Sequence, residues 1–161
     1  MLEFDGLKRR VRASVTKTAF FQSPDGAVAV HRSEGAGPPI VLIHGNSCSA
    51  RSFCRQLDGP LGQRRRLVAI DLAGHGRSEN AGDPAAYRLP GLARTLAELA
   101  AALGLGEAGF VGWSLGGRIV LEASGRCRLQ DLNPRPTVYK TAALPTELNR
   151  LAVAAQETVD G

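Results

Sequence analysis

The chain has 161 residues, of which 43% are hydrophobic and 22% charged. This composition fits one globular domain and excludes a disordered or fibrous chain. The net charge of +5 comes almost entirely from scattered arginines, which favours a solvated surface over a nucleic-acid or membrane partner. The two densest basic groups, residues 8–10 and 64–66, lack the interleaved aromatic side chains that stack on single strands.

Three cysteines, Cys48, Cys54 and Cys127, are an odd number without metal-like spacing. They indicate reduced thiols, as in a cytoplasmic protein. The basic N-terminus is followed by no apolar signal segment, and no run approaches the ~18 apolar residues of a membrane span. We therefore expect a cytoplasmic protein without cofactor or metal.

The first elements predicted along the chain are a loose basic lead-in over residues 1–17 and a β-hairpin. Residues 18–22 and 27–31 form its two short strands. Ser, Pro, Asp and Gly at 23–26 supply the backbone angles of the tight turn between them.

Continuous apolar runs at residues 40–43 and 67–70, and a shorter one at 110–111, predict strands that are buried on both faces. Helices are predicted over 49–57 and, on the leucine spacing, over 92–103. Strands that alternate with helices indicate an α/β fold with a mostly parallel sheet, helices on both faces and an antiparallel amino-terminal hairpin.

The strongest chemical signal is Gly-Trp-Ser-Leu-Gly at residues 112–116, an instance of G-x-S-x-G. It follows the short strand at 110–111 and precedes an apolar stretch at 118–123 that can be helical, which is the context this motif requires. A sharp turn of this kind holds the serine in a strained conformation, and its flanking positions leave room only for glycine. Ser114 is therefore the candidate nucleophile.

A second signal, His44-Gly45-Asn46, comes directly after the buried strand at 40–43. An oxyanion hole needs two N–H donors aimed at one point. We expect these donors to be the backbone N–H groups of Leu115, after the nucleophile, and of Asn46. His44 is interpreted as a structural brace of its loop, because it precedes the nucleophile in the chain.

A third signal is the polar, glycine-rich stretch at residues 71–78, which follows the strand at 67–70. It has neither Walker A spacing nor G-x-G-x-x-G, which excludes a phosphate-binding loop. Asp71, His75 and Arg77 are interpreted as loop-stabilising, with a direct catalytic part as the alternative.

Residues 44–47, 71–78 and 112–117 together resemble, in order and spacing, the amino-terminal half of the α/β-hydrolase superfamily. The similarity extends over about residues 18–123. It is greatest to small bacterial esterase-like and perhydrolase-like enzymes with a GWSLGG or GHSMGG elbow. The resemblance implies a serine hydrolase with a small-molecule acyl substrate, and a serine at the elbow argues against the epoxide hydrolase and haloalkane dehalogenase branches.

The triad that this resemblance implies is incomplete. In this superfamily the acid and the histidine follow the nucleophile in the chain, but residues 115–161 contain no histidine. The later aspartates, Asp131 and Asp160, do not follow strand-like runs. We therefore expect a partial hydrolase domain over 18–125, truncated after the elbow helix.

Residues 126–161 are interpreted as an atypical tail, which allows one helix at 146–159. The string at 131–136 resembles peptides obtained by conceptual translation of transfer-RNA genes, which implies a frameshift or truncation near Arg126. The strand at 110–111 would then form an uncovered sheet edge and allow self-association.

Three functional hypotheses follow. The first is a working serine hydrolase with nucleophile Ser114. The second is a catalytically incomplete fragment or pseudoenzyme that lacks the triad acid and histidine. The third, a basic nucleic-acid binder, rests on the net charge alone.

Overall fold

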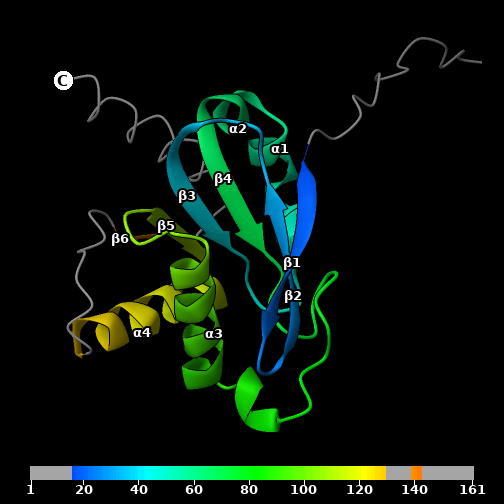
Figure 1. Cartoon of the computed structure of the whole chain (residues 1–161), viewed down its shortest axis with the longest axis vertical. Coiled ribbons are helices and arrows are strands. Elements are labelled where there is room, and N and C mark those ends of the chain that lie inside the picture. Colours follow the sequence, from blue (N-terminus) through cyan, green and yellow to red (C-terminus); the bar gives the residue numbers. More distant parts are fainter. Residues whose placement is uncertain (1–15, 130–138, 143–161) are drawn as a thin grey trace, which may run out of the picture.

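A computed structural model describes residues 16–129 and 139–142. Its centre is a six-stranded sheet in the order β1-β2-β4-β3-β5-β6 (Figure 1). The strands are β1 (Lys17–Ser23), β2 (Gly26–Arg32), β3 (Gly37–Ile43), β4 (Arg65–Ile70), β5 (Gly109–Trp113) and β6 (Tyr139–Ala142). The hairpin β1–β2 and the pair β2–β4 are antiparallel, whereas β4, β3, β5 and β6 run parallel. The predicted α/β architecture is confirmed.

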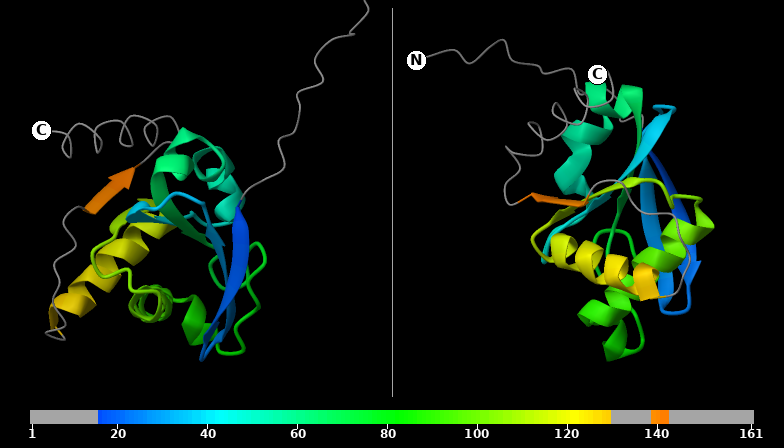
Figure 2. Two further views of the ribbon diagram at one scale, coloured as in Figure 1. Left: turned by 45° about the horizontal axis from the view of Figure 1, so that its top comes forward. Right: turned by 90° about the vertical axis from the view of Figure 1, so that its left-hand side faces the viewer.

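Helices cover both faces of the sheet (Figure 2). One face carries α3 (Leu89–Ala102) and α4 (Leu115–Leu129), and the other carries η1 (Ala50–Phe53), α1 (Cys54–Leu57) and α2 (Pro60–Arg64). A short helix η2 (Pro84–Tyr87) precedes α3. Neither α2 nor η2 is predicted from the sequence.

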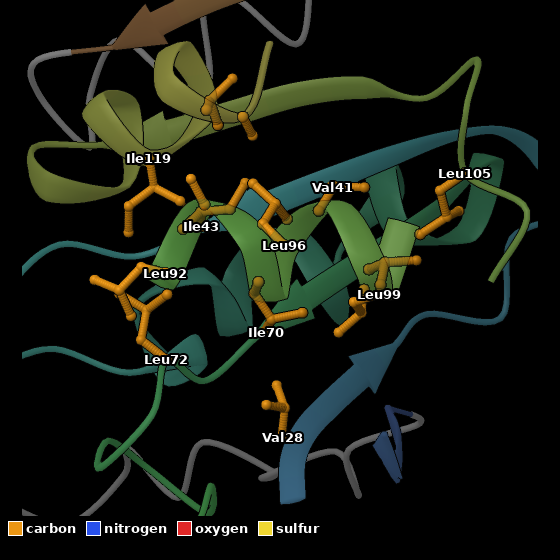
Figure 3. Close-up of a cluster of buried hydrophobic side chains, with 14 of the residues drawn as sticks. Val28, Val41, Ile43, Ile70, Leu72, Leu92, Leu96, Leu99, Leu105 and Ile119 are labelled. Atoms are coloured by element: carbon orange, nitrogen blue, oxygen red, sulfur yellow. The ribbon is translucent and has the colours of Figure 1, made fainter. Parts of the chain in front are cut away.

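The two faces have separate cores because successive side chains of a strand point to opposite sides. On β3, Val41 and Ile43 pack toward α3 and α4 (Figure 3). Leu42 packs toward Phe53 and Leu57 on the opposite face. Leu92, Leu96 and Leu99 of α3 are buried as predicted, whereas Leu103, which follows the last residue of the helix, is only partly buried. The strands that carry the candidate site are therefore fixed from both sides.

One expectation about the sheet is wrong. The strand predicted at 110–111 is not an edge, because β5 pairs in parallel with β6, with Phe110 opposite Tyr139. The outer strand of the described sheet on this side is β6, which no pattern in the sequence predicts. The other strand without a second neighbour is β1.

The proposed domain boundaries remain predictions. The lead-in up to residue 15 and the predicted helix at 146–159 lie outside the described residues. Helix α4 continues to Leu129, beyond the expected boundary at residue 125. No helix in the described ranges is long and apolar enough to cross a membrane.

Candidate active site

Ser114 lies in the turn between β5 and α4. Its side chain is exposed, and its φ of 51° places the backbone in the left-handed region. Few residues other than glycine adopt this conformation, because Cβ then crowds the following carbonyl group. The strand–turn–helix context that the motif predicted is therefore present, and the serine sits at a strained position.

The glycines of the elbow are required by close backbone contacts. A Cβ on Gly112 would collide with the backbone of Gly116 and Gly117, and a Cβ on Gly116 would collide with the carbonyl oxygen of Ile43. The turn can therefore bring α4 against the end of β3 only if both positions lack a side chain.

The loop after β3 lies directly against this elbow. A Cβ placed on Gly45 would stand 2.6 Å from Cδ1 of Trp113 and 3.2 Å from Cβ of Ser114. Asn46 follows Gly45 and is exposed. Leu115 is the first residue of α4, so its N–H group has no acceptor within the helix. The structure thus places the segment that contains Asn46 beside Ser114 and Leu115.

His44 is completely buried. Its Nδ1 lies 2.7 Å from the carbonyl oxygen of Gly45, and its Nε2 accepts the N–H of Leu72 at 3.0 Å. This pair of contacts requires a neutral ring protonated at Nδ1. Burial is the main cause that lowers the pKa of His44, since it disfavours the charged ring. His44 therefore braces the loop.

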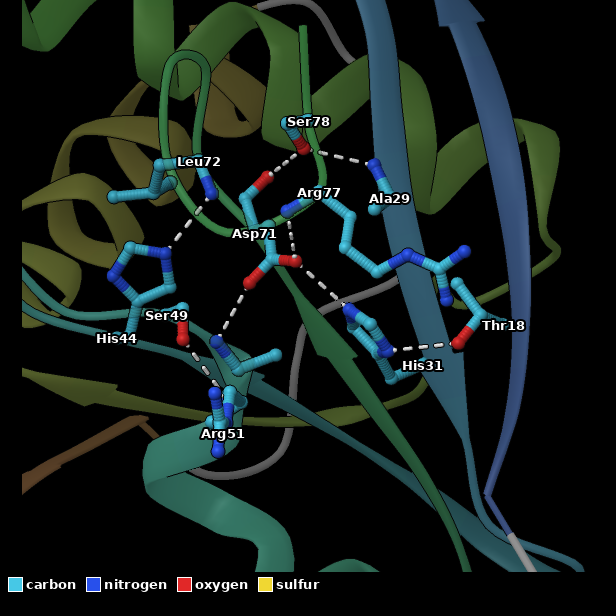
Figure 4. Close-up of polar contacts among 11 residues, drawn as sticks. Thr18, Ala29, His31, His44, Ser49, Arg51, Asp71, Leu72, Arg77 and Ser78 are labelled. Carbon is cyan, nitrogen blue, oxygen red and sulfur yellow. Dashed lines mark hydrogen bonds and ion pairs between the residues drawn. The ribbon is translucent and has the colours of Figure 1, made fainter.

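Asp71 connects four segments of the chain (Figure 4). Its Oδ1 accepts the N–H of Ala50 at 2.7 Å, and its Oδ2 accepts the N–H of Arg77 at 2.9 Å and lies 2.9 Å from Nε2 of His31. Burial alone would raise the pKa of Asp71. The hydrogen bonds from His31, Ala50 and Arg77 outweigh burial and lower it.

His75 and Arg77 make contacts within and beside the same loop. Nδ1 of His75 lies 2.9 Å from the carbonyl oxygen of Ala73, and its ring centre is 5.3 Å from that of His44. The guanidinium of Arg77 lies 5.7 Å from the centre of the Phe20 ring. These are the contacts of loop-stabilising residues.

Sequence reasoning missed the part of His31 in this network. Its Nδ1 lies 3.1 Å from Oγ1 of Thr18, and its Nε2 binds Asp71. The antiparallel register of β2 and β4 places His31 opposite Ala69, two residues before Asp71. That register is a long-range property, so no local pattern in the sequence could reveal the pair.

No hydrogen bond joins any of the three histidines to Ser114 in the described part of the chain. His31 and His44 use both ring nitrogens in other contacts, and His75 uses Nδ1. Within the described ranges, no group of three or more His, Cys, Asp or Glu side chains could hold a metal ion.

We expect Ser114→Gly to be more stable than Ser114→Ala by about 1 kcal/mol. Both variants lose the hydroxyl, but only glycine relieves the positive φ, and its greater freedom in the unfolded chain offsets part of the gain. Chemical denaturation of the two variants measures the difference. Equal free energies of unfolding would contradict a strained elbow.

Comparison with known proteins places the chain in a family. A family model described as alpha/beta hydrolase fold matches residues 38–127. An uncharacterized protein of Mycobacterium tuberculosis is 32% identical over 114 residues, which cover 71% of this chain and 33% of that protein. A non-heme haloperoxidase of Rhodococcus erythropolis is 33% identical over 98 residues, 61% of this chain and 35% of the enzyme.

Solved structures agree with the family. The N-acyl homoserine lactonase AidH, complexed with N-butanoyl homoserine, is 41% identical with a TM-score of 0.66, covering 68% of this chain and 40% of the lactonase. An epoxide hydrolase from Vigna radiata is 21% identical with a TM-score of 0.65, covering 71% of this chain and 37% of the epoxide hydrolase. At this identity the likeness shows the fold alone. This chain spans about a third of the length of its curated relatives. It belongs to the α/β-hydrolase fold family.

Proposed function

We propose that this chain carries the nucleophile and the oxyanion-binding part of a serine hydrolase that acts on an ester or similar acyl substrate. The observation that carries the proposal is the positive φ of the exposed Ser114 in the turn between β5 and α4. Strained residues of this kind concentrate at functional sites. The likeness to a lactonase at 41% identity supports a small acyl compound, such as a lactone, as substrate.

In this mechanism Oγ of Ser114 attacks the carbonyl carbon of the substrate. The carbonyl oxygen becomes negatively charged and accepts hydrogen bonds from the N–H groups of Asn46 and Leu115. The partial positive charge at the start of α4 favours the same anion. Collapse of the tetrahedral intermediate expels the alcohol and leaves an acyl group on Ser114, which water then removes.

The mechanism also needs a general base that takes the proton from the hydroxyl of Ser114. The histidines of this chain all precede Ser114. His31 and His44 bind other groups through both ring nitrogens, so neither presents a ring nitrogen to the hydroxyl of Ser114. We also propose a cytoplasmic location, which the free thiols of Cys48 and Cys54 support.

A fluorophosphonate probe tests the nucleophile. We expect a slow adduct on Ser114, found by mass spectrometry and absent from Ser114→Ala. Added imidazole should accelerate the adduct, because it supplies a general base from solution. Ser47 and Ser49, in the neighbouring loop, serve as internal controls. Labelling of Ser114 no faster than of these two serines would refute the proposal.

A second candidate is a catalytically incomplete fragment or a pseudoenzyme. The observation that favours it is the absence of histidine from residues 115–161. This alternative predicts no Ser114-dependent adduct even with imidazole. It also predicts self-association, measured by sedimentation, through an outer strand of the sheet.

A further inference from the structure

The loop after β3 is held at both ends by the two residues that follow β4. At its start, Nε2 of His44 accepts the N–H of Leu72 at 3.0 Å. At its end, the N–H of Ala50 donates to Oδ1 of Asp71 at 2.7 Å. Asn46, whose N–H is the proposed oxyanion donor, lies between these two attachments.

The attachment at Asp71 is itself rigidly supported. Its carboxylate is 2% exposed, and Oδ2 is bound by the N–H of Arg77 and by His31. The backbone carbonyl of Asp71 accepts the hydroxyl of Ser78 at 2.7 Å. A Cβ on Gly76 would collide with the carboxylate, so the following loop wraps directly around it. Asp71 can therefore act as a fixed anchor for the end of the oxyanion loop.

The loop has little support of its own between the anchors. Asn46 and Ser47 are exposed, and Ser47 has a φ of 56°. On its inner side the loop touches the elbow, where Gly45 lies against Trp113 and Ser114. A shift of the loop would therefore move the Asn46 N–H relative to the hydroxyl of Ser114.

We propose that Asp71 is a positioning residue that sets the oxyanion hole by holding the N–H of Ala50, while His44 holds the other end of the loop. The inference rests on the proposed function, because Asn46 matters only if its N–H binds an oxyanion. Oxyanion donors act over about 2.7–3.1 Å, and a misplacement of about 1 Å can cost about a hundredfold in rate. If the loop were held at one end only, the N–H of Asn46 would no longer be fixed within this range of distances.

The decisive variant is Asp71→Asn, which keeps size and shape. The amide group has one oxygen, so it can accept from Ala50 or from Arg77 but not from both. We expect faster hydrogen exchange at the Ala50 amide, by about tenfold or more. We also expect a changed emission of Trp113, the only tryptophan of the chain, which lies against the loop. Adduct formation at Ser114 should fall by about tenfold or more.

Asp25→Asn is the matched control. The carboxylate of Asp25 likewise has a side-chain partner, with Oδ2 at 2.6 Å from Arg94, but it lies in the turn of the β1–β2 hairpin. This variant should leave the Trp113 emission, the Ala50 exchange and the labelling of Ser114 unchanged.

The outcomes separate this inference from the proposed function. The fluorescence and exchange measurements report loop position without any reaction, so they test the anchor even if Ser114 forms no adduct. A folded Asp71→Asn protein that matches the wild type in all three measurements overturns the inference. If the variant does not fold, hydrogen exchange in the wild type decides. Exchange of the Ala50 amide at the rate of an unstructured peptide overturns the inference, and strong protection of that amide supports it.

Discussion

Gly116→Ala is expected to destabilise the protein by about 2 kcal/mol, although the substitution is made in a helix. Alanine favours a helix over glycine by about 1 kcal/mol. At this position, however, the new Cβ would collide with the carbonyl oxygen of Ile43 and approach that of His44 to 2.8 Å. Overpacking of this kind costs about 3 kcal/mol when backbone must move, so the collision outweighs the helical preference.

Gly82→Ala is the control for this prediction. A Cβ on Gly82 meets nothing within 4 Å, and its backbone is not in the left-handed region. Its free energy of unfolding should stay within about 0.5 kcal/mol of the wild type. Thermal or denaturant unfolding of both variants gives the comparison. A Gly116→Ala protein as stable as Gly82→Ala would mean that β3 and α4 are not held at this distance.

The parts of the fold that could be predicted are those in which local pattern and burial coincide. The apolar run at residues 40–43 predicted a strand buried on both faces, and β3 is flanked by β4 and β5 beneath helices on each side. The elbow was predictable for a related reason, since the glycines around Ser114 are a local steric requirement.

The parts that escaped prediction depend on partners far away in the chain. Strand β6 is Tyr-Lys-Thr-Ala, which lacks an apolar run, and it is defined by its pairing with β5. Helix α2 has five residues and begins with a proline, too short for a helical period. The contact of His31 with Asp71 spans 40 positions and follows from strand register.

The residues of the candidate site likewise fall into those that local motifs reveal and those that distant contacts position. Ser114, Leu115 and Asn46 were selected from motifs, and they remain predictions as catalytic groups. The sequence predicts only part of the role of Asp71, which joins several segments of the chain. Its loop was recognised, but the bond to Ala50 joins two loops whose proximity follows from the parallel register of β3 and β4.

Asp71→Ala is expected to cause the largest loss of stability, about 3 to 5 kcal/mol, because it leaves one buried donor and two partly buried donors without an acceptor. The N–H groups of Ala50 and Arg77 and the ring of His31 would all lose their partner. A domain has a total free energy of unfolding of about 5–15 kcal/mol, so this loss is a large share. Asp25→Ala, which removes an exposed ion pair with Arg94, should cost far less.

The pH dependence of this loss gives a second measurement. The hydrogen bonds lower the pKa of Asp71 in the folded protein below the ordinary 3.8. As the pH falls below about 3.8, the unfolded chain therefore takes up the proton before the folded protein does. The stabilisation by Asp71 is present above this pH and is lost as the pH falls through the folded pKa. The stabilities of the wild type and Asp71→Ala should thus converge in acid, whereas a constant difference would show that the charge of Asp71 contributes nothing.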